Sequence, residues 1–155
     1  MLNLSETIGE RLLLTLWVGA LWSIGYLAVP LAFVSLETLV AAEYAAKLFF
    51  AVNVIGLISG TLILLGKLSI QRGWAIHSWR FWVLIVMLMI TLIFSMYIQP
   101  EMASIKTIDN WRMNTELAGS FERLHMLSQN LYLMLSIAGL LLVLSTDKQH
   151  TARQT

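Results

Sequence analysis

The chain contains no cysteine among its 155 residues, so disulfides, thiol nucleophiles and cysteine metal sites are excluded. Charge is scarce as well, because charged residues make up 12% of the chain, whereas a soluble domain carries roughly 25%. With a net charge of +1, the chain has no extended basic surface, and nucleic acid is not an expected partner. No phosphate-binding loop or nucleophile–base pair occurs in the sequence, so neither an enzyme activity nor a cofactor is predicted.

Apolar residues, by contrast, account for 58% of the chain. As helices, their longest runs can cross a hydrocarbon core of about 30 Å. We therefore predict an all-α membrane protein, folded as an antiparallel bundle of four transmembrane helices in the lipid bilayer. The bundle forms one domain, 1–155, and ends in a polar tail at 147–155. The four runs that lack Asp, Glu, Lys and Arg are 12–36, 48–66, 81–100 and 124–146.

Lysine and arginine are unevenly divided between the two sides of this predicted bundle. The side of the N-terminus, the loop 67–80 and the tail holds six of them, and the other side holds four. Because cytoplasmic loops carry an excess of Lys and Arg, both termini are predicted to be cytoplasmic. The acidic start, MLNLSETIGER, is not typical of a cleaved signal peptide, so the first helix is expected to be retained.

Small residues in the first two runs are typical of helices that approach closely in lipid. Gly19 and Ser23 lie in the first run, and Gly56 and Gly60 form a GxxxG pair in the second. We predict that all four serve helix packing. Pro30 removes a backbone donor and predicts a bend near the end of the first helix.

The segment between the third and fourth runs is the longest polar connection. Pro100 predicts a sharp end to the third helix. Apolar residues then recur at roughly helical spacing from Met102 to Trp111, with polar residues between them. A short amphipathic helix on the outer membrane surface is predicted here.

The fourth run opens with polar residues, in the stretch FERLHMLSQNLY at 121–132. At about 100° per residue, its polar side chains fall on one stripe of the helix. Such groups in a span normally face protein or water, so the stripe is predicted to face the bundle interior. Polar residues of the other helices lie at a similar depth. We therefore predict a polar cavity in the outer leaflet, lined by Glu122, His125, Gln129, Tyr132, Asn53, Tyr97 and Gln99.

Three functions and one structural role are compatible with this stripe. The cavity would bind a small ligand or a partner helix, whereas the structural role is hydrogen bonding between helices, worth about 0.6 kcal/mol per bond. A haem or copper redox site using His125 and Met126 would need a second protomer, since a bis-histidine haem requires two axial histidines at one depth and His77 and His150 lie on the other side or in the tail. Glu122 and His125 form only one of the two motifs that a di-iron bundle needs. A small transporter or channel subunit would also require oligomerisation. The expected protein partner is a second copy of the chain or another membrane protein.

Several segments resemble the transmembrane-protein-205-like family, also known as domain of unknown function 4149, in their order and spacing. They are Trp-Val-Gly at 17–19, Pro30, Gln-Pro at 99–100, and Phe-x-x-x-His at 121–125. The resemblance extends over about residues 10–145 and implies a four-helix integral membrane protein, here a bacterial member in the inner membrane, with no established reaction. It also matches His125 to a histidine in the family's fourth helix.

Overall fold

The computed structural model describes residues 2–71 and 76–145, and the helices follow one another without an intervening strand in these residues. The predicted tail at 147–155 and Thr146 lie outside the described residues. The elements, in chain order, are α1 (Leu2–Ser23), the π-helical turn η1 (Ile24–Ala28), α2 (Val29–Ser35), α3 (Thr38–Gln71), α4 (Trp79–Ile93), the π-helical turn η3 (Phe94–Ile98), α5 (Gln99–Lys106) and α6 (Thr115–Leu144).

These elements form four helical rods, each long and apolar enough to cross a membrane. The chain is therefore a multi-pass integral membrane protein, as predicted. Large apolar side chains such as Val34 and Leu144 are exposed on the rods, as expected for surfaces that face lipid. Each span begins before the predicted run, because flanking charged residues are also helical. The four spans are Ile8–Ser35, Thr38–Ser69, Trp79–Lys106 and Thr115–Leu144.

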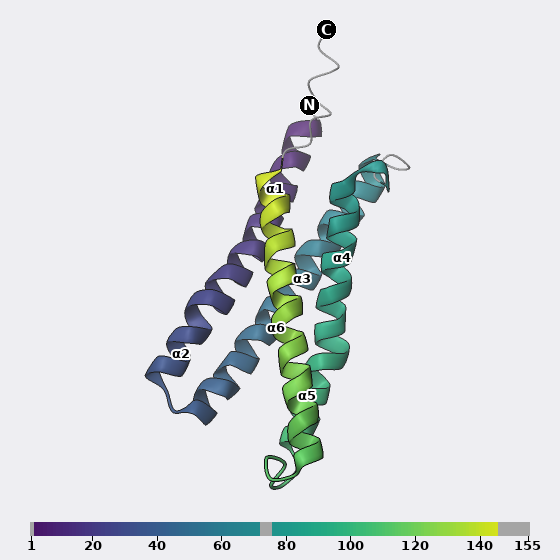
Figure 1. The fold of residues 1–155 in the computed structure, drawn as a ribbon. Coiled ribbons are helices and arrows are strands. Elements are labelled where there is room, and N and C mark those ends of the chain that lie inside the picture. Colours follow the sequence, from purple (N-terminus) through teal and green to yellow (C-terminus); the bar gives the residue numbers. More distant parts are fainter. Residues whose placement is uncertain (1, 72–75, 146–155) are drawn as a thin grey trace.

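The rods run antiparallel to their neighbours along the chain (Figure 1). One end of the bundle holds the start of α1 and the end of α6, and we call it the terminal end. The opposite end holds the turns at 36–37 and 107–114, and we call it the hairpin end. The hairpin end corresponds to the predicted outer side.

A π-helical turn precedes a proline in both rods that lead away from the terminal end. Pro30 follows η1 and Pro100 follows η3, each with one residue between the turn and the proline. A proline ring clashes with the carbonyl four residues earlier, and in both rods that carbonyl lies inside the π-helical turn. The wider turn accommodates the clash, so the helix continues. Pro100 therefore does not end the third rod as predicted, and α5 extends it to Lys106.

The separate amphipathic surface helix predicted between Met102 and Trp111 does not form. Met102 and Ile105 belong to α5, and Ile105 is buried where α5 packs against α6. The chain reverses over 107–114, and the Asn114 side chain then caps α6 by accepting two backbone N–H bonds. The apolar spacing of this segment thus serves packing between two rods instead of contact with the membrane surface.

The contact between α1 and α3 depends on the two glycines of the GxxxG pair. The fully buried ring of Trp17 lies so close to α3 that a Cβ added at Gly56 would be 2.5 Å from its Nε1 atom. A Cβ added at Gly60 would be 2.9 Å from its Cζ3 atom. Gly19 and Ser23 lie instead on the exposed surface of α1, and a Cβ at Gly19 would meet nothing within 4 Å. These two residues lie away from the α1–α3 contact, because α1 turns its other face towards α3, and their packing role stays a prediction.

The rods separate towards the hairpin end (Figure 1). There α2 packs against α3 and η1, and it forms no comparable contact with α6. By contrast, α1 packs closely against both α3 and α6 nearer the terminal end. The first turns of α6 therefore lack the neighbouring helix that covers its later turns.

Candidate functional site

The polar stripe of α6 is divided between the inside and the outside of the bundle. Ser136 is buried and Tyr132 is half-buried, whereas Glu122, His125 and Gln129 are exposed. The division occurs because α2 diverges from α6, so that no helix covers the part of the stripe near the hairpin end. The prediction that the whole stripe faces the interior is therefore wrong for these three residues.

His125 is held along the surface of α6 by residues of the same helix. Its imidazole stacks on the Phe121 ring, with centroids 6.2 Å apart and planes inclined by 9°. The Gln129 Nε2 atom lies 3.2 Å from His125 Nε2 and donates to it when that ring nitrogen carries no proton. Among the described residues, neither side chain forms a hydrogen bond to another helix.

Phe121 connects His125 to a cluster of rings and cations in the turn at the hairpin end. The rings of Phe121 and Trp111 are 4.6 Å apart. Lys106 Nζ lies 5.6 Å from the Phe121 centroid, and the Arg112 guanidinium lies 5.2 Å from that of Trp111. Such contacts contribute about 0.5–1 kcal/mol each at exposed sites. The two contacts to Phe121 attach the turn and the end of α5 to the start of α6, beside His125.

Tyr132 fastens three rods together and does not line a cavity. Its hydroxyl donates a 2.7 Å hydrogen bond to the Leu21 carbonyl, just before η1. Its ring occupies the space beside Gly25, where an added Cβ would be 2.3 Å from Cε1. The ring also meets Phe49 of α3 edge to face at 5.1 Å. Its insertion beside η1 is consistent with the local widening of that helix.

Asn53 is the most buried of the predicted cavity residues, with 5% of its surface exposed. Its Nδ2 atom has no hydrogen-bond partner among the described residues, and neither does the Nε1 atom of Trp17. The Trp17 nitrogen lies against Gly56, one turn along α3 from Asn53. An unsatisfied buried donor costs about 1–3 kcal/mol. The close α1–α3 contact thus leaves two donors at a position where an acceptor would be stabilised.

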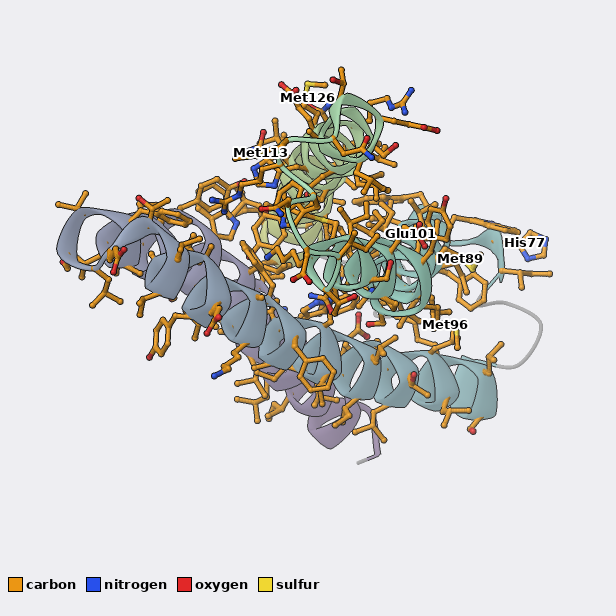
Figure 2. All side chains as sticks on the ribbon, turned by 90° about the horizontal axis from the view of Figure 1, so that it is seen from below. His77, Met89, Met96, Glu101, Met113 and Met126 are labelled. Atoms are coloured by element: carbon orange, nitrogen blue, oxygen red, sulfur yellow. The ribbon has the colours of Figure 1, made fainter. Side chains whose placement is uncertain are left out.

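Tyr97 and Gln99 do not join the stripe. Tyr97 is 59% exposed in η3, Gln99 is half-buried at the start of α5, and no hydrogen bond links either to α6 among the described residues. Figure 2 shows Met126 and Met96 on different sides of the bundle. Within the described parts of the chain, no three His, Asp or Glu side chains are grouped to hold a metal ion. The seven predicted residues therefore do not line one enclosed cavity.

Three charged residues that the sequence presents only as flanking charges meet at the terminal end. Glu10 Oε2 lies 2.9 Å from Lys67 Nζ, and Glu10 Oε1 lies 3.2 Å from Arg80 Nη2. The side chains of Lys67 and Arg80 are only 5% and 7% exposed. Arg80 Nη1 also donates to the Leu142 carbonyl at 3.0 Å and to Ser145, where α6 ends. This group, the terminal charge cluster, joins all four rods.

The sequence does contain a signal for the terminal charge cluster. Glu10, Lys67 and Arg80 each lie within a few residues of the end of an apolar run. Because the spans are antiparallel, those three ends lie at one depth. The sequence does not show how each helix is rotated about its own axis. That rotation decides whether charges at one depth face each other or the lipid headgroups.

Residues 12–110, more than half of the chain, match the protein family described as Domain of unknown function (DUF4149). Comparison with curated proteins and with solved structures finds no match.

Proposed function

Because the chain belongs to the DUF4149 family, whose description assigns no activity, we propose a function from the surface of α6. The protein is a membrane-embedded binding module that holds a transmembrane helix of another chain. The binding surface, which we call the α6 polar face, consists of Glu122, His125 and Gln129. The proposal keeps the binding role predicted for these residues and replaces the enclosed cavity with a lateral surface.

The observation that carries this proposal is the exposed pair formed by His125 and Gln129. The two side chains lie one turn apart in an apolar helix and hydrogen-bond to each other. Lipid cannot satisfy their remaining polar atoms, so polar groups in a span usually face protein. A helix that offers an amide or hydroxyl group would supply the missing partners, at about 0.6 kcal/mol per bond.

The spacing of exposed residues on α6 also suits a helical partner. Glu122, Met126, Gln129 and Leu133 are all exposed and are separated by four, three and four residues. Two helices that pack side by side use this spacing. Within the span, a polar residue between apolar seam positions, here Gln129 between Met126 and Leu133, fixes their register. A small molecule would instead favour a concave site. Gln129 is the register-setting residue of this proposal.

A photoreactive amino acid at position 129 tests the proposal in the membrane of the producing cell. We expect a covalent adduct with a protein at position 129 and none at position 127. Leu127 is the matched control, because it is exposed at the same depth but lies on a different side of α6. His125→Leu should reduce the adduct about threefold, the factor that corresponds to one interhelical hydrogen bond.

Two outcomes contradict this function. Adducts with lipid alone at position 129 would mean that no helix covers the face. Equal protein adducts at 129 and 127 would mean that contact there is random. Copies of the chain carrying two different tags show whether the bound helix belongs to a second copy or to another protein.

We also infer that the module is a transmembrane-protein-205-like protein of a bacterial inner membrane, with cytoplasmic termini. The support for this orientation is the distribution of Lys and Arg, six on the side of the termini against four on the other. The α6 polar face would then lie in the outer leaflet.

A further inference from the structure

A hollow of about 250 Å³ opens beside the terminal charge cluster, between the start of α1 and the end of α6. Arg11, Leu14 and Thr15 line it from α1, Leu142 and Ser145 line it from α6, and Arg80 lies beneath them. The spans of α1 and α6 end at Ile8 and Leu144. The hollow therefore lies where the hydrocarbon core gives way to the lipid headgroups.

Among the described residues around this hollow, the charges do not balance. Glu10 is the one carboxylate among them that the structure describes, and it already pairs with both Lys67 and Arg80. Arg11 adds a third cation, is exposed, and forms no ion pair with any described residue. Part of the Arg80 charge is taken up by the carbonyls at the end of α6. The charge of Arg11 is left for an anion.

The walls of the hollow define the kind of anion. An arginine guanidinium binds the oxygens of a phosphate through two parallel hydrogen bonds, and the Thr15 hydroxyl can donate a third. Leu14 and Leu142 make the rest of the wall apolar, and the neighbouring Leu12 and Leu144 are exposed along the same two rods. This combination suits a phosphate that carries acyl chains.

We propose that the hollow binds the phosphate headgroup of an anionic phospholipid. Arg11 is the cation that contacts the phosphate, and Arg80 forms the base of the hollow and is held there by Glu10 and the end of α6. Basic pockets between transmembrane helices at the headgroup level are suited to such lipids. This site is independent of the α6 polar face, which lies towards the opposite end of the bundle. Inorganic phosphate shares the same chemistry, so the test separates the two sources.

Native mass spectrometry of the full chain in detergent provides the test. Phosphatidylglycerol, phosphatidylcholine and inorganic phosphate are added separately, and the bound fraction is measured. We expect phosphatidylglycerol to bind more tightly than phosphatidylcholine, and Arg11→Gln to weaken it about fivefold. Arg123→Gln is the matched control, since it removes an exposed arginine near the hairpin end. It should leave binding unchanged.

Three results would overturn the proposal. Equal binding of the two lipids would remove the need for a net negative charge. Equal losses in Arg11→Gln and Arg123→Gln would indicate general attraction to positive charge instead of a site. Competition by inorganic phosphate at the concentration of the lipid would assign the hollow to a soluble anion. Thermal unfolding of both variants without lipid verifies that each is folded.

Discussion

At the scale of single residues, Glu10 has the largest predicted effect on stability. It is the carboxylate that faces two cations, Lys67 and Arg80, at distances of 2.9 and 3.2 Å. Removing one partner of a buried ion pair is costly because it leaves the other charge buried and uncompensated. Removing one of two cations is milder, because Glu10 then keeps the second.

We therefore expect Glu10→Gln to destabilise the protein by about 3 kcal/mol, the lower end for a broken buried pair, since Glu10 is 23% exposed. Lys67→Met should lower the free energy of unfolding by clearly less. The methionine side chain fills the space of the lysine stem, and the Glu10–Arg80 pair remains. Tryptophan fluorescence during thermal and denaturant unfolding in detergent measures both. Glu43→Gln, at an exposed carboxylate, is the control. A smaller effect of Glu10→Gln than of Lys67→Met would contradict this account.

At the scale of elements, the contact between α1 and α3 is set by how closely Trp17 approaches the backbone of α3. Gly56 permits this approach, whereas a Cβ there would be 2.5 Å from Nε1 and 2.8 Å from Cε2 of the indole ring. The ring is rigid and fully buried, so it cannot move aside without shifting α1. Gly66 lies on the same helix, and a Cβ there would meet nothing within 4 Å.

The same substitution at these two glycines should have opposite effects. Gly56→Ala should destabilise the protein by about 1–3 kcal/mol through overpacking. Gly66→Ala should be neutral or stabilising by up to about 1 kcal/mol, because alanine favours the helix over glycine. Denaturant unfolding monitored by circular dichroism measures both changes. Equal effects would show that the two rods do not rely on the close contact at Trp17.

At the scale of the whole molecule, four spans place the start of α1 and the end of α6 on the same side of the membrane. The chain has no native cysteine, so one introduced thiol reports the side on which it lies. Ile76→Cys marks the turn before α4, and Met113→Cys marks the turn before α6; both positions are exposed.

In a bacterial inner membrane with cytoplasmic termini, a membrane-impermeant maleimide should label Met113→Cys in intact spheroplasts. Ile76→Cys should react only after the membrane is permeabilised. Labelling with the opposite pattern would reverse the orientation and place the α6 polar face in the inner leaflet. Labelling of both thiols in intact spheroplasts would contradict the single span, Trp79–Lys106, that separates the two sites.

The number of spans and their helical type follow from the lengths and positions of the apolar runs. Uncharged apolar runs of membrane-spanning length cannot fold in water, and in lipid their backbone must be helical. The ends of the rods were less predictable. Pro100 predicts the end of a helix from the sequence, yet the π-helical turn η3 before it allows the helix to continue past Pro100.

The sequence by itself determined that this is a four-span membrane protein, and it placed the polar residues of α6 on one side of the helix. Tertiary structure alone decided which of them face protein. Tyr132 and His125 share the stripe, but only Tyr132 meets α1, because α2 diverges from α6 before it reaches His125. Likewise, only packing shows that Glu10, Lys67 and Arg80 meet. Hydropathy fixes the depth of a side chain, whereas the rotation and divergence of helices arise from contacts between distant parts of the chain.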